Sequence, residues 1–190
     1  MSTIGLPAAL VFLFWAVLFA QRTRRFPSDH FLQRAAEGTA GSVVAIVPAR
    51  NEAEVLRDSL SSLLAQDHPE FRVVLVDDNS TDGTSRVASE IGAASEVGME
   101  VVAAGHKPAG WAGKVFAQSR GLAHVLGSGP APDWLLLTDA DIRHPPDSVT
   151  SLLAKARRGG YDLVSVMARL HAASFFERLL IPPFVYFFHL

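Results

Sequence analysis

The stretch SVVAIVPARNEAEVLRDSLSSLLAQ, residues 42–66, joins a short β-branched run to a helical pattern. Ser42–Val47 is almost wholly apolar, as in a buried strand, and Glu52–Gln66 repeats leucine at the spacing of one helical face. A second apolar run, Phe71–Val76, follows it. A strand, a helix and a strand in this order predict two parallel strands joined by a crossover helix.

The same alternation continues along the chain. Because crossover helices cover a parallel sheet, we predict an α/β fold with a mostly parallel sheet and helices on both faces, over residues 42–170. Such sheets bind ligands at the carboxyl ends of their strands, so the residues that follow each strand are the informative ones. The further predicted segments are helix Thr84–Ile91, strand Met99–Ala103, helix Lys114–Leu126, strand Trp134–Thr138, helix Asp147–Arg158 and strand Tyr161–Met167.

The composition excludes several classes of protein. The chain has 190 residues and a formal net charge of −2, from 17 basic and 19 acidic side chains. Nucleic-acid binding needs a basic surface, so we expect no nucleic-acid partner. The absence of cysteine excludes disulfides and thiolate chemistry. Hydrophobic residues make up 49% of the sequence, which is enough for a sizeable core.

The amino-terminal end has the features of a membrane anchor. Residues 1–21 carry no charged side chain, and Ile4–Ala20 is almost wholly apolar, at the short end of what spans a bilayer. The basic cluster Arg22–Arg25 follows, whereas a secretory signal peptide has its positive charge first. We therefore predict a transmembrane helix over 1–21 and a linker over 22–41 on the cytoplasmic side. A buried core helix or a cleaved signal is the alternative.

The carboxyl-terminal end is also apolar. Ser174–Leu190 reads SFFERLLIPPFVYFFHL and stops inside an apolar run without a polar cap. We expect residues 171–190 to be the truncated start of an interfacial or membrane segment, so that the chain is the amino-terminal fragment of a longer protein. Together with the basic cluster, this predicts an inner (cytoplasmic) membrane protein whose folded domain lies on the cytoplasmic side.

Charged side chains follow the first two predicted strands. Asn51 is suited to cap the helix that begins there, and Glu52 suits the positive end of the helix dipole. Arg50 opposes that dipole and is either a ligand contact or a solvated surface side chain. After the second strand, Asp77 and Asp78 put two carboxylates side by side, where one can accept hydrogen bonds from a nucleobase or a ribose hydroxyl.

A lysine and two further carboxylates follow the third and fourth strands. Lys114 stands where a helix begins, beside free backbone N–H groups, which favours a phosphate site. His106 and Trp111, in the preceding loop, either line a sugar pocket or serve only the loop. Asp139 and Asp141 leave a buried strand at positions i and i+2, so both point the same way and can share one hard cation, Mg²⁺ or Mn²⁺. The alternative is a pair of solvated loop acids.

Four motifs occur in an order that matches a known family: IVPARNE, VLVDDNSTDGT, GWAGKVFA and LLTDADI. The set resembles family-2 glycosyltransferases of the GT-A (Rossmann-like) fold, over roughly Val43–Phe188. The WAGK stretch and the apolar flanks are similar to those of the hopene-associated glycosyltransferases of bacterial hopanoid gene clusters.

The resemblance implies a divalent metal on Asp139 and Asp141, the D-x-D pair, with Asp141 the more direct ligand. It also implies that Asp78 hydrogen-bonds the base, that Asp77 supports its loop and that Lys114 approaches the diphosphate. The nucleotide-sugar site implied is Pro48, Arg50, Glu52, Asp77, Asp78, Lys114 and Asp139.

The activity implied is transfer of a sugar, with inversion, from a nucleotide-diphosphate donor to an acceptor. A membrane anchor suggests a lipid acceptor, related to hopanoids in this branch, and the metal would act as a Lewis acid on the diphosphate. The family's general base and its Q-x-x-R-W-type motif do not occur before Leu190, so we expect the base beyond that residue and independent activity of this chain is in doubt. The alternatives are a nucleotidyltransferase and a non-catalytic nucleotide-sugar-binding membrane protein.

Overall fold

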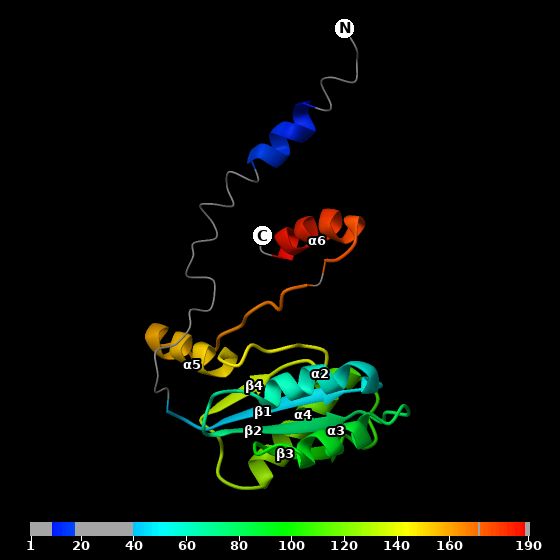
Figure 1. Ribbon diagram of the computed structural model, residues 1–190, viewed down its shortest axis with the longest axis vertical. Coiled ribbons are helices and arrows are strands. Elements are labelled where there is room, and N and C mark those ends of the chain that lie inside the picture. The colour runs from blue at the N-terminus through cyan, green and yellow to red at the C-terminus, as the bar shows by residue number, and fades with distance from the viewer. Residues whose placement is uncertain (1–8, 18–39, 171, 189–190) are drawn as a thin grey trace.

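Four parallel strands form the central sheet, in the order β3-β2-β1-β4 (Figure 1). The computed structural model describes residues 9–17, 40–170 and 172–188. The sheet confirms the predicted parallel topology at four of the five expected strands. The strands are β1 (Val43–Ala49), β2 (Phe71–Asp77), β3 (Gly98–Ala103) and β4 (Trp134–Leu137).

The register brings the ends of these strands to one edge. β1 pairs with β2 from Val43 opposite Phe71 to Ala49 opposite Asp77, and all seven of its residues are buried. On its other side β1 pairs with β4, up to Ile46 opposite Leu137. Because the strands run parallel, the loops that carry the polar motifs all leave from this carboxyl edge.

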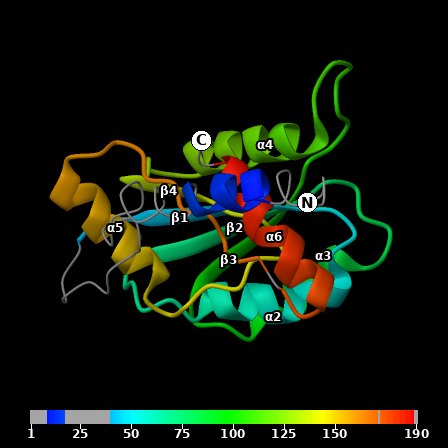
Figure 2. The same cartoon turned by 90° about the horizontal axis from the view of Figure 1, so that it is seen from above.

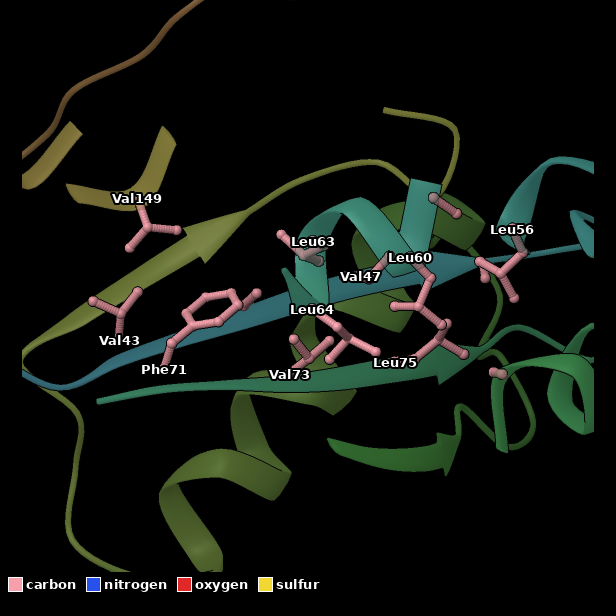
Figure 3. Close-up of a cluster of buried hydrophobic side chains, with 14 of the residues drawn as sticks. Val43, Val47, Leu56, Leu60, Leu63, Leu64, Phe71, Val73, Leu75 and Val149 are labelled. Atoms are coloured by element: carbon pink, nitrogen blue, oxygen red, sulfur yellow. The ribbon is translucent and has the colours of Figure 1, made fainter. Parts of the chain in front are cut away.

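Helices cover both faces of the sheet, as predicted (Figure 2). Helices α2 (Ala53–Leu64), α3 (Thr84–Ala93) and α5 (Ser148–Gly159) contribute to the core on one face, and α4 (Gly113–Gly127) packs on the other. Alternate side chains of β1 enter the two cores, and each fully buried Val or Leu contributes about 1.5–3 kcal/mol. Figure 3 shows the α2 side of this packing, with labelled side chains Val43, Val47, Leu56, Leu60, Leu63, Leu64, Phe71, Val73, Leu75 and Val149.

The fifth predicted strand, Tyr161–Met167, is wrong. The segment follows Gly160, which ends α5 in the left-handed conformation with φ of 61°, and it has no regular structure. Leu163 is 84% exposed. A β-branched pattern reports only a local preference, whereas a strand also needs a neighbour with free backbone groups. Within residues 40–170 the segment pairs with none of the four strands, although β3 and β4 each have one free edge.

Two apolar helices lie apart from the α/β domain, beyond its β4 edge (Figure 1). Residues 9–17 are helical, and α6 spans Phe175–Phe188. Among the residues that the structure describes, no helix has both the length and the apolar character needed to cross a bilayer. Most of the predicted anchor (1–21) and linker (22–41) lies outside the described residues, so both stay predictions.

Candidate active site

A cleft of about 350 Å³ opens at the carboxyl edge of the sheet. It is bordered by the loops after β1, β2 and β4 and by the first turns of α4. Every residue predicted for the nucleotide-sugar and metal sites lines it except Asp77. The lining residues are Pro48, Ala49, Arg50, Glu52, Asp78, Gly113, Lys114, Ala117, Asp139, Ala140 and Asp141.

The loops after β1 and β2 are tied together by side chains that serve both helix starts. Asp82 accepts hydrogen bonds from the backbone N–H of Ala53, at the start of α2, and of Thr84, at the start of α3, both at 3.0 Å. The pKa of Asp82 is lowered, first by the Thr84 hydroxyl and then by the Ala53 N–H. The prediction that Asn51 caps α2 is wrong: Asn51 has φ of 54°, and its side-chain oxygen accepts from the Thr81 N–H at 2.8 Å.

Asp78 is a buried carboxylate whose side-chain partners both lie at long hydrogen-bond distances. The residue is 5% exposed, and its oxygens lie 3.4 Å from Arg50 Nη1 and 3.4 Å from Asn79 Nδ2. Both distances exceed those of a strong hydrogen bond. Gly113 permits this position, because a Cβ there would lie 2.8 Å from Asp78 Oδ2. Asp78 therefore has acceptor capacity for a donor group in the cleft.

Asp77 has a different place. Its carboxylate accepts a hydrogen bond from the Ser80 N–H at 3.0 Å, so it stabilises the turn that begins with Asp78. This geometry agrees with a supporting role in the loop and puts Asp77 outside the cleft lining.

Carboxylates crowd the other end of the cleft. The pKa of Glu52 is raised, mainly by burial, then by the charges of Asp141, Asp82 and Asp139. Lys114 Nζ lies 2.5 Å from Asp139 Oδ1 and balances part of this charge. A divalent cation would stabilise the ionised carboxylates further, so their oxygens fit a hard metal. Within the described residues, no three or more His, Asp or Glu side chains are grouped so that they could hold a metal ion by themselves.

Sequence reasoning missed the small residues of the cleft and left two loop residues open. Ala49, Gly113, Ala117 and Ala140 line the cleft, and their signal was a run of small side chains next to each motif. His106 and Trp111 do not line it. The Trp111 ring instead meets the Phe116 ring edge-on, with centroids 5.8 Å apart.

A parallel α/β sheet with acidic loops around a cleft at its carboxyl edge is the architecture of nucleotide-binding enzymes. Residues 44–186 match the profile of glycosyl transferase family 2, and the chain belongs to this family.

Curated relatives are named as transferases that act on a lipid phosphate. The chain is 31% identical over 144 residues to the undecaprenyl-phosphate 4-deoxy-4-formamido-L-arabinose transferase of Klebsiella pneumoniae, covering 72% of this chain and 39% of that protein. It is 30% identical over 143 residues to the protein of the same name from Enterobacter sp., with the same coverage. The chain thus spans about two fifths of the length of these relatives.

Solved structures share the fold at lower identity. The mannosyltransferase PcManGT of Pyrobaculum calidifontis, in complex with GDP-Man and Mn²⁺, aligns with a TM-score of 0.55 and 24% identity, over 78% of this chain and 42% of that one. Residues 1–349 of S. aureus TarS, in complex with UDP-GlcNAc, align with a TM-score of 0.53 and 23% identity, over 71% and 38% of the two chains.

Proposed function

We propose that this chain binds a nucleoside-diphosphate sugar and that the whole protein transfers the sugar to a membrane lipid with inversion. One observation carries the proposal: Asp78, Lys114 and the pair Asp139 and Asp141 all line a single cleft. Asp78 lies more than sixty residues before Asp139 in the sequence, so the parallel sheet is what brings the two acids together.

The proposed roles follow the chemistry of each end of the cleft. The buried carboxylate of Asp78 accepts hydrogen bonds from the nucleobase, with Arg50 beside it. Pro48 and Glu52 flank the nucleotide. The ammonium of Lys114, now against Asp139, reaches the diphosphate and stabilises the negative charge that grows on it in the transition state.

Asp139 and Asp141 are the residues that would hold a divalent cation, Mg²⁺ or Mn²⁺. Both are carboxylate donors, and their charges raise the pKa of Glu52, after the larger effect of its burial. A bound cation supplies Lewis-acid stabilisation of the leaving diphosphate. A structural relative whose complex contains GDP-Man and Mn²⁺ supports this assignment.

The acceptor we propose is a lipid at the cytoplasmic face of the inner membrane. The apolar stretches at both ends of the chain and the undecaprenyl-phosphate transferases among its relatives support a membrane acceptor. The WAGK resemblance favours a hopanoid-related lipid within that class. Parallel assays with a polyprenyl phosphate and with a hopanoid alcohol would separate the two.

Substitution of Asp141 tests the activity. In the full-length protein, Asp141→Ala should lower metal-dependent release of the nucleoside diphosphate from the nucleotide-sugar by about 100-fold or more, because a stabilisation of several kcal/mol is removed. Glu96→Gln is the matched control, since Glu96 is exposed and lies near the amino-terminal end of β3, away from the cleft.

The same assay addresses the other candidate functions. Unchanged turnover in Asp141→Ala would refute the metal-site role. Release of pyrophosphate from a nucleoside triphosphate would identify a nucleotidyltransferase instead. Calorimetric binding of a nucleoside diphosphate with Mn²⁺, without turnover in the full-length protein, would identify a non-catalytic binder.

A further inference from the structure

The loop that carries the D-x-D pair rests against α2. Residues 138–147 connect β4 to α5 without regular secondary structure. At their start, the hydroxyl of Ser59 donates a short hydrogen bond to the backbone carbonyl of Ala140. Ala140 stands between Asp139 and Asp141, so this contact holds the backbone that joins the two carboxylate-bearing residues.

Ser62 of α2 and Gln66, two residues beyond its end, hold the rest of the loop and the start of α5. Ser62 Oγ accepts from the backbone N–H of His144 at 2.9 Å. Gln66 Nε2 donates to the Pro145 carbonyl at 2.9 Å, and its oxygen accepts from the Val149 N–H at 3.0 Å. Ser59, Ser62 and Gln66 are spaced at i, i+3 and i+7, so they lie along one side of the helix and its end.

The side chains of Ser59 and Gln66 are polar but are buried where α2 packs through apolar side chains. Ser59 is 3% exposed and Gln66 8% exposed. A small void of about 10 Å³ lies beneath the loop. Ser59 lines it together with the apolar side chains of β1 and α2, which are Val47, Leu56, Leu60 and Leu63. Burying a hydroxyl or an amide among apolar groups is unfavourable unless it forms hydrogen bonds. The loop backbone provides part of those bonds. Carbonyls of α2 provide the others, with Val55 and Leu56 at 3.2 and 3.3 Å from the Ser59 hydroxyl and Ser62 at 3.2 Å from Gln66 Nε2.

We infer that Ser59, Ser62 and Gln66 are positioning residues that set the relative placement of Asp139 and Asp141 for a shared cation. The loop has no strand or helix of its own to hold it, so its geometry depends on hydrogen bonds, and these ties are the ones that α2 and Gln66 supply next to the two carboxylates. Groups that orient metal ligands typically change metal affinity by 10–100-fold when removed. The inference rests on the proposed function, because it takes a divalent cation as the ligand of the two acids.

The test is Mn²⁺, titrated into the full-length protein with a saturating nucleoside diphosphate and followed by electron paramagnetic resonance, because the carboxylates in the described part of the chain do not complete a metal site by themselves. Ser59→Ala should weaken Mn²⁺ binding about tenfold or more and broaden the spectrum of the bound ion. Ser89→Ala is the matched control, since Ser89 is an exposed helical serine whose hydroxyl bonds only within α3, to the Ser85 carbonyl at 2.9 Å. Ser62→Ala is a second variant in case Ser59→Ala does not fold, which thermal unfolding would reveal.

The outcomes separate the inference from the proposed function. Wild-type protein that leaves Mn²⁺ unbound contradicts the proposed metal site itself. Wild type that binds Mn²⁺, with folded Ser59→Ala or Ser62→Ala giving the same affinity and the same spectrum, contradicts only the positioning role. Weaker binding in these variants, with Ser89→Ala unchanged, supports it.

Discussion

Glu52 is held in the cleft among other carboxylates, and this gives the protein a specific dependence on pH. Its pKa lies above the ordinary 4.5, because burial and then Asp141, Asp82 and Asp139 disfavour its ionised form. The folded protein therefore binds this proton more tightly than the unfolded chain does. The contribution to stability is fully present below 4.5 and is lost as pH rises through the raised pKa.

Glu52→Gln should accordingly stabilise the protein at about pH 8 and lose most of that advantage near pH 4. The amide keeps the shape of the side chain and carries no charge at either pH. Urea unfolding at the two pH values measures the difference. Glu54→Gln, on an exposed side chain of the same helix turn, is the control, and an equal pH profile for the two variants would count against the explanation.

At the scale of the elements, α4 approaches the sheet through a glycine. A Cβ on Gly121 would lie 2.6 Å from Ile46 Cγ2 and 2.9 Å from Val76 Cγ2, closer than side chains tolerate. The helix is thereby held against β1 and β2, and its first turn, with Gly113 and Lys114, lies at the cleft.

Gly121→Ala should therefore lower the free energy of unfolding by about 1–3 kcal/mol, despite the better helix propensity of alanine. Gly127, in the last turn of α4, has open space at the Cβ position. Gly127→Ala should be neutral or stabilise by up to about 1 kcal/mol. Chemical denaturation measures the free energy of unfolding of both variants. If Gly121→Ala and Gly127→Ala were equally stable, the packing of α4 would not depend on the close approach at Gly121.

At the scale of the whole molecule, the apolar ends lead us to expect two modes of membrane association. Residues 1–21 are predicted to span the bilayer, and α6 exposes Phe176, 69%, and Leu180, 63%. An apolar helix that lies in the membrane–water interface is held more weakly than a helix that crosses the bilayer.

Deletion of residues 1–21 should make the protein extractable from bacterial membranes by alkaline carbonate, while it remains membrane-bound at neutral pH. Adding Phe176→Glu and Leu180→Glu should then release it, because each charge opposes insertion. Leu122→Glu, on exposed Leu122 of α4, is the control and should change nothing. A truncated protein that stays in the carbonate pellet would contradict the anchor.

The strand and helix pattern and the charged residues after each strand were enough to predict the parallel sheet and the charged residues of the cleft, but not its small residues. Periodicity reports which face of one element is apolar, and parallel strands necessarily end at one edge. The sequence therefore determined the convergence of Asp78 with Asp139 and Asp141 before any coordinates.

Only the tertiary structure decided what each element meets. Tyr161–Met167 has a strand-like pattern but no neighbouring strand within the described part of the chain, Asn51 ties two loops instead of capping α2, and Ser59 holds the Ala140 carbonyl. Such contacts join residues up to 81 positions apart in the case of Ser59 and Ala140. They depend on packing between elements, which no local pattern encodes.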